Sequence, residues 1–160
     1  MKVLMVCMGN ICRSPMLEGW LRAAVDADAA LRGRVEVDSA AIGAWHVGRP
    51  PDPRAIAEAS RHGVDIAGQR ARQLRASDFR DFDLLLFADA ETLRDGCRRA
   101  SAGAGGHAAR YLEWAGAEGD HDLADPYYGD AGDFRAAWAR IEAAGPAVLA
   151  RLRAVFDARG

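Results

Sequence analysis

The sequence predicts an α/β fold, a three-layer α/β/α sandwich around a central, four-stranded parallel sheet. The order of two kinds of segment supports this fold class. Short apolar runs, typical of strands that are buried on both faces, alternate with longer segments of helical periodicity. Such alternation favours βαβ units, whose strands pair in parallel through right-handed crossovers. Ligands of such sheets bind beyond the carboxyl ends of the strands.

The first strand and the first helix flank a compact loop. Residues 2–6, Lys-Val-Leu-Met-Val, have the length and the apolar character of a buried strand. The loop covers residues 7–13. A helix is expected to begin with Ser14 as its cap and Pro15 at its first position, and to end near Leu31.

The second strand and the second helix are separated by a long loop. Residues 35–38, Val-Glu-Val-Asp, alternate as a strand does. The Gly- and Pro-rich stretch over residues 43–53 predicts the loop. A short helix is expected over residues 53–62, where Gly63 stops it.

The second half of the chain is expected to add two strands and two helices. Residues 84–88, Leu-Leu-Leu-Phe-Ala, predict a third buried strand, and a short helix follows over residues 89–99. The fourth strand is expected at residues 109–112, and a closing helix at residues 134–156. The connecting segments are expected to be a flexible turn at residues 101–106 and a polar loop at residues 116–130.

The bulk composition predicts one cytoplasmic domain spanning residues 1–160. No apolar run approaches the roughly 18 residues of a membrane span, and the N-terminal strand lacks the long apolar region of a signal peptide. Three cysteines, an odd number, argue against a secreted disulfide framework. The formal net charge of −2 provides no field to attract nucleic acid or an anionic membrane, so neither is an expected partner.

The loop after the first strand is expected to bind a phosphate group or another oxyanion. Its residues, in order, are Cys7, Met8, Gly9, Asn10, Ile11, Cys12 and Arg13, and Ser14 follows them. Successive N–H groups of such a tight loop can form an anion-binding nest, and the dipole of the following helix adds positive potential. Gly9 and Asn10 tolerate the left-handed backbone that a nest requires. No metal ion is needed for this mode of binding.

Cys7 and Arg13, at the two ends of this loop, are the expected catalytic residues. Sites of this kind lower the pKa of a thiol to roughly 3.5–7.5, so Cys7 is expected to be a thiolate that the Ser14 hydroxyl can stabilise. The planar fork of Arg13 can bind two phosphoryl oxygens, which a lysine does less well. The alternative is that Cys7 is a small buried residue ending a strand. A nucleotide-binding loop is disfavoured because no Gly-Lys-Ser/Thr follows.

The ten residues from Val6 to Pro15 resemble the signature of the low-molecular-weight protein tyrosine phosphatases. The resemblance continues in the family's order at Asp38-Ser39, Trp45-His46-Val47-Gly48, Pro51-Asp52-Pro53-Arg54-Ala55, Ala71-Arg72-Gln73, Asp78-Phe79, Phe82-Asp83 and Asp125-Pro126-Tyr127-Tyr128. It implies an enzyme that hydrolyses phosphotyrosine and small aryl phosphates without a cofactor.

The same resemblance implies which residues act as general acid and base and which contact the substrate. Sequence chemistry alone cannot choose a general acid among 23 acidic residues, whereas the resemblance assigns general acid and base to Asp125. The implied mechanism passes through a phosphocysteine on Cys7. Trp45, Tyr127 and Tyr128 are similar to the family's aromatic substrate walls, although loop aromatics can also cover a core.

The resemblance also bears on three residues near the loop. Ser39, which directly follows the predicted second strand, is expected to support the loop. Cys12 lies five residues after Cys7, and the resemblance implies a reversible disulfide between them that protects Cys7 from oxidation; a small buried residue is the alternative. Relatives that act on phosphoarginine tend to have threonine at the position of Ile11, so isoleucine favours tyrosine.

The sequence departs from the family pattern at two places. Gln69 stands where members often carry a histidine that supports the loop asparagine, and Ala88-Asp89 stands where they often carry Met-Asp. The four histidines share no metal-ligand spacing, so no metal site is expected. The arginines between Arg70 and Arg80 are expected on a solvated face.

Two other functions compete with a phosphatase. An arsenate reductase shares this fold and loop but needs two further cysteines, and only Cys97 lies beyond the loop. A module that binds phosphotyrosine without cleaving it is disfavoured because Cys7, Arg13 and Asp125 are all present. The expected partner is a phosphotyrosine-containing protein such as a tyrosine kinase, and the expected state is a monomer or a weak dimer.

Overall fold

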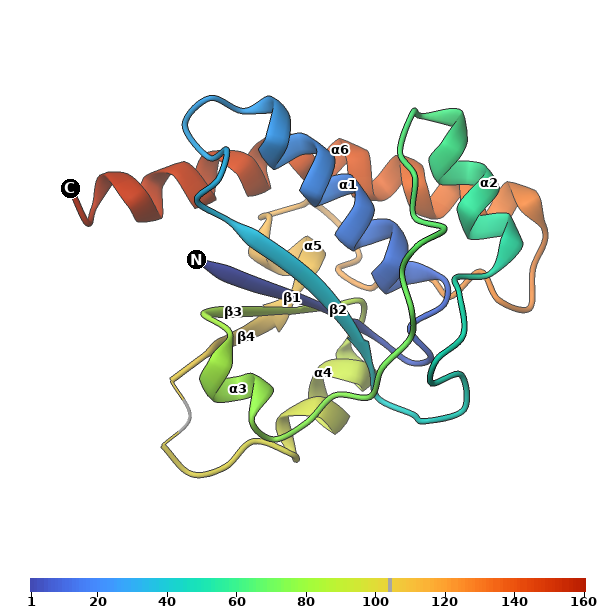
Figure 1. Cartoon of the computed structure of the whole chain (residues 1–160), viewed down its shortest axis with the longest axis horizontal. Coiled ribbons are helices and arrows are strands. Elements are labelled where there is room, and N and C mark those ends of the chain that lie inside the picture. Colours follow the sequence, from blue (N-terminus) through green and yellow to red (C-terminus); the bar gives the residue numbers. More distant parts are fainter. Residues whose placement is uncertain (104) are drawn as a thin grey trace.

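The centre of the molecule is a four-stranded sheet with the order β2–β1–β3–β4, in which every neighbouring pair is parallel (Figure 1). The computed structural model describes residues 1–103 and 105–160. The strands are β1 Lys2–Cys7, β2 Glu36–Ala41, β3 Leu84–Phe87 and β4 His107–Arg110. The predicted parallel sheet of four strands is confirmed.

Helices cover both faces of this sheet, because alternate residues of its central strands enter two different apolar cores. Val3 and Met5 of β1 lie in the first core, and Leu4 and Val6 lie in the second. The helices over the first core are α1 (Arg13–Ala27), α2 (Pro53–Arg61), α5 (Tyr111–Trp114) and α6 (Ala131–Asp157). The helices over the second core are α3 (Asp78–Asp81) and α4 (Ala90–Cys97). The predicted three-layer sandwich is therefore confirmed.

Helix α1 differs from its prediction at both ends. It begins at Arg13, with Cys12 at the capping position and no side-chain cap, so the prediction of Ser14 as the cap is wrong. The physical reason is that the Ser14 hydroxyl makes its hydrogen bonds inside the loop, to Cys7 and Asn10. The helix ends at Ala27 rather than near residue 31, because the Asp28 side chain accepts from backbone N–H groups of the following turn.

The boundaries of β2 and β4 also differ from their predictions, because pairing with neighbouring strands sets where each strand ends. Strand β2 extends beyond residue 38 to Ala41, in register with the end of β1, which carries Ser39 toward the carboxyl edge of the sheet. The predicted strand at residues 109–112 is right for residues 109 and 110 and wrong for residues 111 and 112. Strand β4 ends at Arg110, and Tyr111 turns into α5, where its hydroxyl donates to the Ile141 carbonyl over 2.8 Å.

Two one-turn helices, α3 and α5, lie outside every predicted helix. The closing helix begins at Ala131 rather than at residue 134, because Asp130 caps it and accepts from Gly132 N and Asp133 N. The other two predicted helices match α2 and α4 within two residues at each end. The predicted turn at residues 101–106 includes residue 104, which lies outside the described residues.

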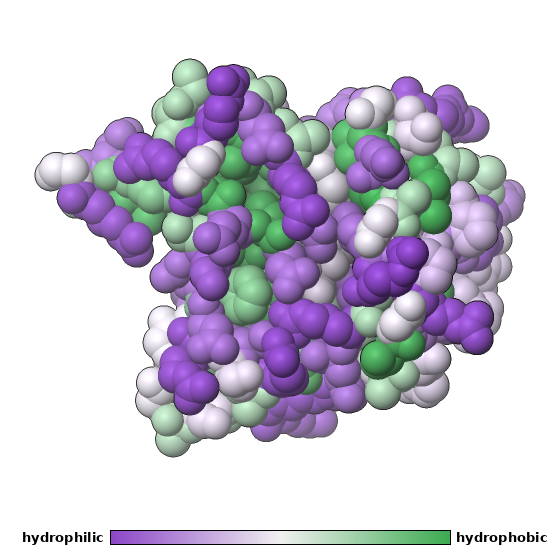
Figure 2. Space-filling view, in the orientation of Figure 1, coloured by the Kyte–Doolittle hydropathy of each residue, from purple (hydrophilic) through white to green (hydrophobic). Residues whose placement is uncertain are grey.

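The carboxyl ends of the strands bring distant loops together at one edge. The amides of Ile42 and Ala88 donate to carbonyls at the end of β1, those of Cys7 and Val6. The Leu123 amide donates to the Ala88 carbonyl, so the residues after β2 and β3 and the segment before α6 meet at this edge. Hydrophilic residues cover most of the face shown in Figure 2, and apolar residues gather beside the C-terminal end of α6. In the described part of the chain, no helix combines the length and the apolar character needed to cross a membrane.

Candidate active site

The loop between β1 and α1 wraps around the sulfur of Cys7. The Asn10 amide donates to Cys7 Sγ over 3.3 Å, which requires the chain to reverse within three residues. Asn10 reverses it with a φ of 57°, and no other non-glycine residue in the described ranges has a positive φ. Asparagine accepts this left-handed backbone at low cost, so the residue type follows from the geometry.

Asn10 is also the centre of a buried network of hydrogen bonds. Its Nδ2 donates to Ser14 Oγ over 2.7 Å and to Ser39 Oγ over 2.9 Å, and its Oδ1 accepts from the Arg72 amide. Because Ser14 Oγ accepts from Asn10, its own proton is free to donate to Cys7 Sγ, 3.0 Å away. The network thus aims a hydroxyl donor at the sulfur. Ser39 in turn donates to Glu18 Oε1 over 2.8 Å.

The guanidinium of Arg13, the first residue of α1, is held by two acceptors. Its Nη1 donates to Asp89 Oδ2 over 2.6 Å and to the Leu123 carbonyl over 2.8 Å. Burial acts to lower the pKa of Arg13, but the charges of Cys7 and Asp89 raise it above its ordinary value. Burial likewise acts to raise the pKa of Asp89, but the hydrogen bond from Arg13 lowers it overall. The pair is therefore ionised at neutral pH.

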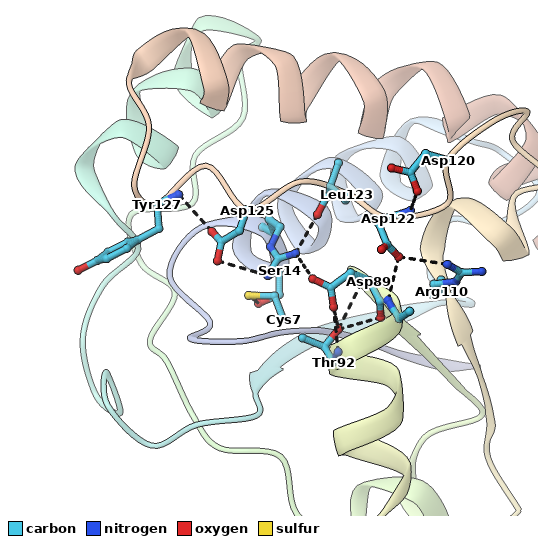
Figure 3. A network of polar contacts seen from close by, with 12 residues as sticks. Cys7, Ser14, Asp89, Thr92, Arg110, Asp120, Asp122, Leu123, Asp125 and Tyr127 are labelled. Carbon is cyan, nitrogen blue, oxygen red and sulfur yellow. Dashed lines mark hydrogen bonds and ion pairs between the residues drawn. The ribbon is translucent and has the colours of Figure 1, made fainter.

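Asp125 reaches the same guanidinium from the loop before α6. Its Oδ2 lies 3.5 Å from Arg13 Nη2, and its Oδ1 accepts from the Tyr127 amide over 3.1 Å (Figure 3). The side chain is 43% exposed, whereas the Arg13 side chain is 3% exposed. Asp125 therefore stands between solvent and the buried cation, on the open side of the loop.

A cavity of about 390 Å³ opens where these groups meet. Its lining residues are Cys7, Met8, Gly9, Ile11, Cys12, Arg13, Trp45, His46, Asp125, Tyr127 and Tyr128. The predicted catalytic and pocket residues are thus brought together, while Asn10, Ser14 and Ser39 are buried behind them. Tyr127 and Tyr128 meet edge to face at 4.9 Å, and Tyr128 is 94% exposed, so these two rings lie at the mouth of the cavity.

Cys12 lies on the cavity wall as a free thiol, and Cys7 is free as well. Burial, followed by the nearby charge of Cys7, raises the pKa of Cys12 well above its ordinary value. Cys12 is therefore protonated in this state. In the described ranges, no three His, Cys, Asp or Glu side chains form a group that could hold a metal ion.

Sequence reasoning missed several residues of this site. Glu18 accepts from Ser39, the Arg72 amide donates to Asn10, and Asp89 holds Arg13. The expectation that the arginines from Arg70 to Arg80 lie on a solvated face is wrong for Arg72, whose guanidinium is half-buried between Asp38 and the buried carboxylate of Asp78. For Glu18 the available signal was a charged residue on an otherwise apolar helix face, and for Arg72 and Asp89 it was their place in the family pattern.

The two departures from the family pattern have different consequences. Gln69 does not reach Asn10; its Nε2 donates to the Pro15 carbonyl over 3.2 Å, and its buried Oε1 has no partner among the described residues. Support of Asn10 therefore comes from Ser39 and Arg72. Asp89 keeps the carboxylate beside Arg13, and Ala88 leaves only a smaller apolar side chain before it.

The chain matches proteins of one family over nearly its whole length. The family model of the low molecular weight phosphotyrosine protein phosphatases matches residues 2–157. A low molecular weight protein-tyrosine-phosphatase of Streptomyces coelicolor is 41% identical, over 99% of this chain and 97% of that protein. Vibrio vulnificus Wzb in complex with benzylphosphonate superposes with a TM-score of 0.80 at 29% identity, over 94% of this chain and 97% of that one.

A third relative differs in its named substrate. The structure called DARP, drosophila arginine phosphatase, superposes with a TM-score of 0.87 at 30% identity, over 95% of this chain and 98% of that one. The shared fold thus includes proteins named for different phosphorylated residues. The chain itself belongs to the family of low molecular weight phosphotyrosine protein phosphatases.

Proposed function

We propose that this protein is a protein tyrosine phosphatase that hydrolyses phosphotyrosine through a phosphocysteine on Cys7. The observation that carries the proposal is the meeting of the Cys7 sulfur, the Arg13 guanidinium and the Asp125 carboxylate in one cavity, on a loop ordered by Asn10. These are the nucleophile, the phosphoryl clamp and the proton carrier that the reaction needs.

The reaction proceeds in two displacements at phosphorus. The Cys7 thiolate attacks in line, the bond from phosphorus to the phenolic oxygen breaks, and protonated Asp125 gives its proton to that oxygen. A water molecule then attacks the phosphocysteine, Asp125 takes a proton from it, and the bond from phosphorus to sulfur breaks. The products are a phenol, inorganic phosphate and the starting thiolate, so no redox change occurs.

The walls of the cavity favour an aryl phosphate. Trp45, Tyr127 and Tyr128 surround its mouth, where they can stack on a substrate ring. Ile11 places an apolar side chain on the same wall, which suits a phenyl ring better than a charged guanidinium. Phosphoarginine is the second candidate because a relative is named as an arginine phosphatase. Comparing kcat/KM for a phosphotyrosine peptide and for phosphoarginine separates the two.

The setting of the activity belongs to the same proposal. We place the enzyme in the cytoplasm, as a monomer or weak dimer, with a phosphotyrosine-containing protein such as a tyrosine kinase as its partner. The three cysteines are all free thiols, which suits a reducing compartment. A reversible disulfide between Cys7 and Cys12 would protect the nucleophile during oxidative stress.

The test is phosphate release from para-nitrophenyl phosphate in the presence of a chelator, with vanadate as inhibitor. Cys7→Ser is expected to abolish turnover. Asp125→Ala is expected to slow the first displacement by about 10²–10⁴-fold, the usual contribution of a general acid. Cys97→Ser, at an exposed cysteine, is the matched control and should keep full activity. Full activity of Cys7→Ser, or a requirement for a divalent metal, would overturn the proposal.

A further inference from the structure

Arg54, in the first turn of α2, spans from that helix to the segment that carries Asp125. Its Nη2 donates to the Tyr127 carbonyl and its Nη1 to the Gly129 carbonyl, each over 2.9 Å. These partners lie 73 and 75 residues further along the chain. The guanidinium also stacks over the ring of Phe134 in α6, 4.5 Å from its centre. Both contacts hold the start of α6 and the segment before it against α2.

The same guanidinium is fixed by a second pair of hydrogen bonds to Asp52. Nε donates to Asp52 Oδ1 and Nη2 donates to Asp52 Oδ2, each over 3.0 Å. The hydrogen bond from Arg54 lowers the pKa of Asp52, so this carboxylate stays charged at neutral pH. Asp52 in turn donates its backbone N–H to the Ile11 carbonyl over 2.8 Å. The Asp52–Arg54 pair therefore joins the phosphate loop to the segment that carries Asp125.

Asp125 depends on this connection for its position. Its own side chain is tied to the chain by the Tyr127 amide, and Arg54 holds the carbonyl of that same residue. Residues 117–130 include no regular helix or strand. Before Asp125 the segment is held by Arg13 and Arg140, which donate to carbonyls of residues 120–123, and after Asp125 it is held by Arg54. A displacement of about 1 Å at a reacting group can cost about a hundredfold in rate.

We propose that Arg54 is a positioning residue, which holds Asp125 over the phosphate loop so that its proton reaches the leaving oxygen. The proposal rests on the proposed function, because it assigns Arg54 a role in the step that Asp125 performs. Arg54 is not among the residues that line the cavity, so its role is one of positioning. Its planar fork supplies four hydrogen bonds in three directions, to Asp52, Tyr127 and Gly129, which the single ammonium group of a lysine cannot reproduce.

The distinguishing measurement is the dependence of kcat/KM on the leaving group. A series of aryl phosphates is compared, from dinitrophenyl phosphate, whose phenol leaves without a proton, to phenyl phosphate, whose phenol needs one. In Arg54→Met, we expect kcat/KM to fall about 10- to 100-fold for phenyl phosphate and less than about threefold for dinitrophenyl phosphate. Arg54→Lys keeps the charge and should show the same steepened dependence.

Three controls decide between positioning and a merely structural role. Arg61→Met removes an exposed arginine from the same helix and should leave the whole series unchanged. In an Asp125→Ala background, Arg54→Met should add less than about twofold, because the proton it helps to deliver is already lost. An equal fall for every substrate, or independent losses from the two substitutions, would overturn the proposal.

The outcome is separable from failure of the proposed function. If Asp125 is not the general acid, Asp125→Ala alone leaves the leaving-group dependence unchanged, whatever Arg54 does. If Arg54→Met does not fold, which thermal unfolding reports, Arg54→Lys decides the question by the same series. A leaving-group dependence in Arg54→Lys equal to that of the parent protein would then refute the positioning role.

Discussion

Asp89→Asn tests whether the buried ion pair orients Arg13 for the phosphoryl group. The substitution removes one charge and leaves the shape of the side chain unchanged. Asparagine caps helices about as well as aspartate, so its oxygen can still accept from the Thr92 amide at the start of α4. The effect should therefore fall on Arg13 rather than on the helix.

The expected magnitude follows from the burial of the pair. The Asp89 side chain is 19% exposed and the Arg13 side chain 3%, and their nitrogen and oxygen lie 2.6 Å apart. A hydrogen bond to a charged group contributes about 1.5–3 kcal/mol, and the second acceptor of Nη1, the Leu123 carbonyl, remains in place. If this energy serves to hold Arg13 in its reactive position, kcat/KM should fall about 10- to 150-fold.

The assay is kcat/KM for para-nitrophenyl phosphate together with inhibition by vanadate, which also needs an oriented Arg13. Asp122→Asn is the matched control, because Asp122 also accepts from a backbone amide at the start of α4 and pairs with Arg110 instead of Arg13 (Figure 3). A folded Asp89→Asn protein whose kcat/KM and vanadate inhibition stay within twofold of the parent would refute the reasoning.

Three further predictions follow from single contacts. Ser14→Ala removes the hydroxyl donor from Cys7 and should lower kcat about tenfold or more, since a hydrogen bond to a charged group contributes about 1.5–3 kcal/mol; an unchanged kcat contradicts this. Burial raises the pKa of Glu18 above its ordinary value, so the native state binds more protons than the unfolded state, and stability falls as pH rises from that ordinary value through the raised one. Glu18→Gln lacks this titration, so its stability relative to the parent should rise over that range in urea unfolding, and parallel pH profiles would contradict it. A methyl group at Gly145 would lie 2.1 Å from the Trp20 ring, so Gly145→Ala should lower the free energy of unfolding by about 1–2 kcal/mol despite the better helix propensity of alanine; a stabilised variant would show that the ring can move.

The sequence predicts elements well where a single pattern decides them. The apolar runs that predict β1 and β3 are each five residues long, and the predicted helix that matches α2 is bounded by Pro53 and Gly63. The helices α3 and α5 have only four residues each, too few for any helical period to appear. The misplaced cap of α1 has a different cause, because the Ser14 hydroxyl is needed by Cys7 and Asn10. At that position the hydrogen bonds of the loop, rather than local capping propensity, decide the conformation.

The residues of the site that are neighbours in the sequence could be predicted, whereas those brought together only by the fold could not. The loop from Cys7 to Arg13 is contiguous, so its residue types alone indicate an anion site. Asp125 could be selected only through the family resemblance, because nothing local distinguishes it from other acidic residues. The contact between Arg13 and Asp89 joins residues 76 positions apart, and that between Arg54 and Gly129 joins residues 75 apart. Such pairs depend on how the strands are ordered in the sheet, which a single sequence does not encode locally.

Arg13 shows why a buried carboxylate beside the phosphate loop can help rather than hinder anion binding. Asp89 offsets the charge of Arg13, yet Nη1 is the only nitrogen of that guanidinium that donates to it, and Nη1 also donates to the Leu123 carbonyl. Among the described residues, Nη2 has only the 3.5 Å contact with Asp125, and no partner competes for Nε. The edge formed by Nε and Nη2 is the one that binds two oxygens side by side. Asp89 thus fixes the plane of the guanidinium while leaving its bidentate edge to the cavity, an arrangement that a lysine at this position cannot adopt.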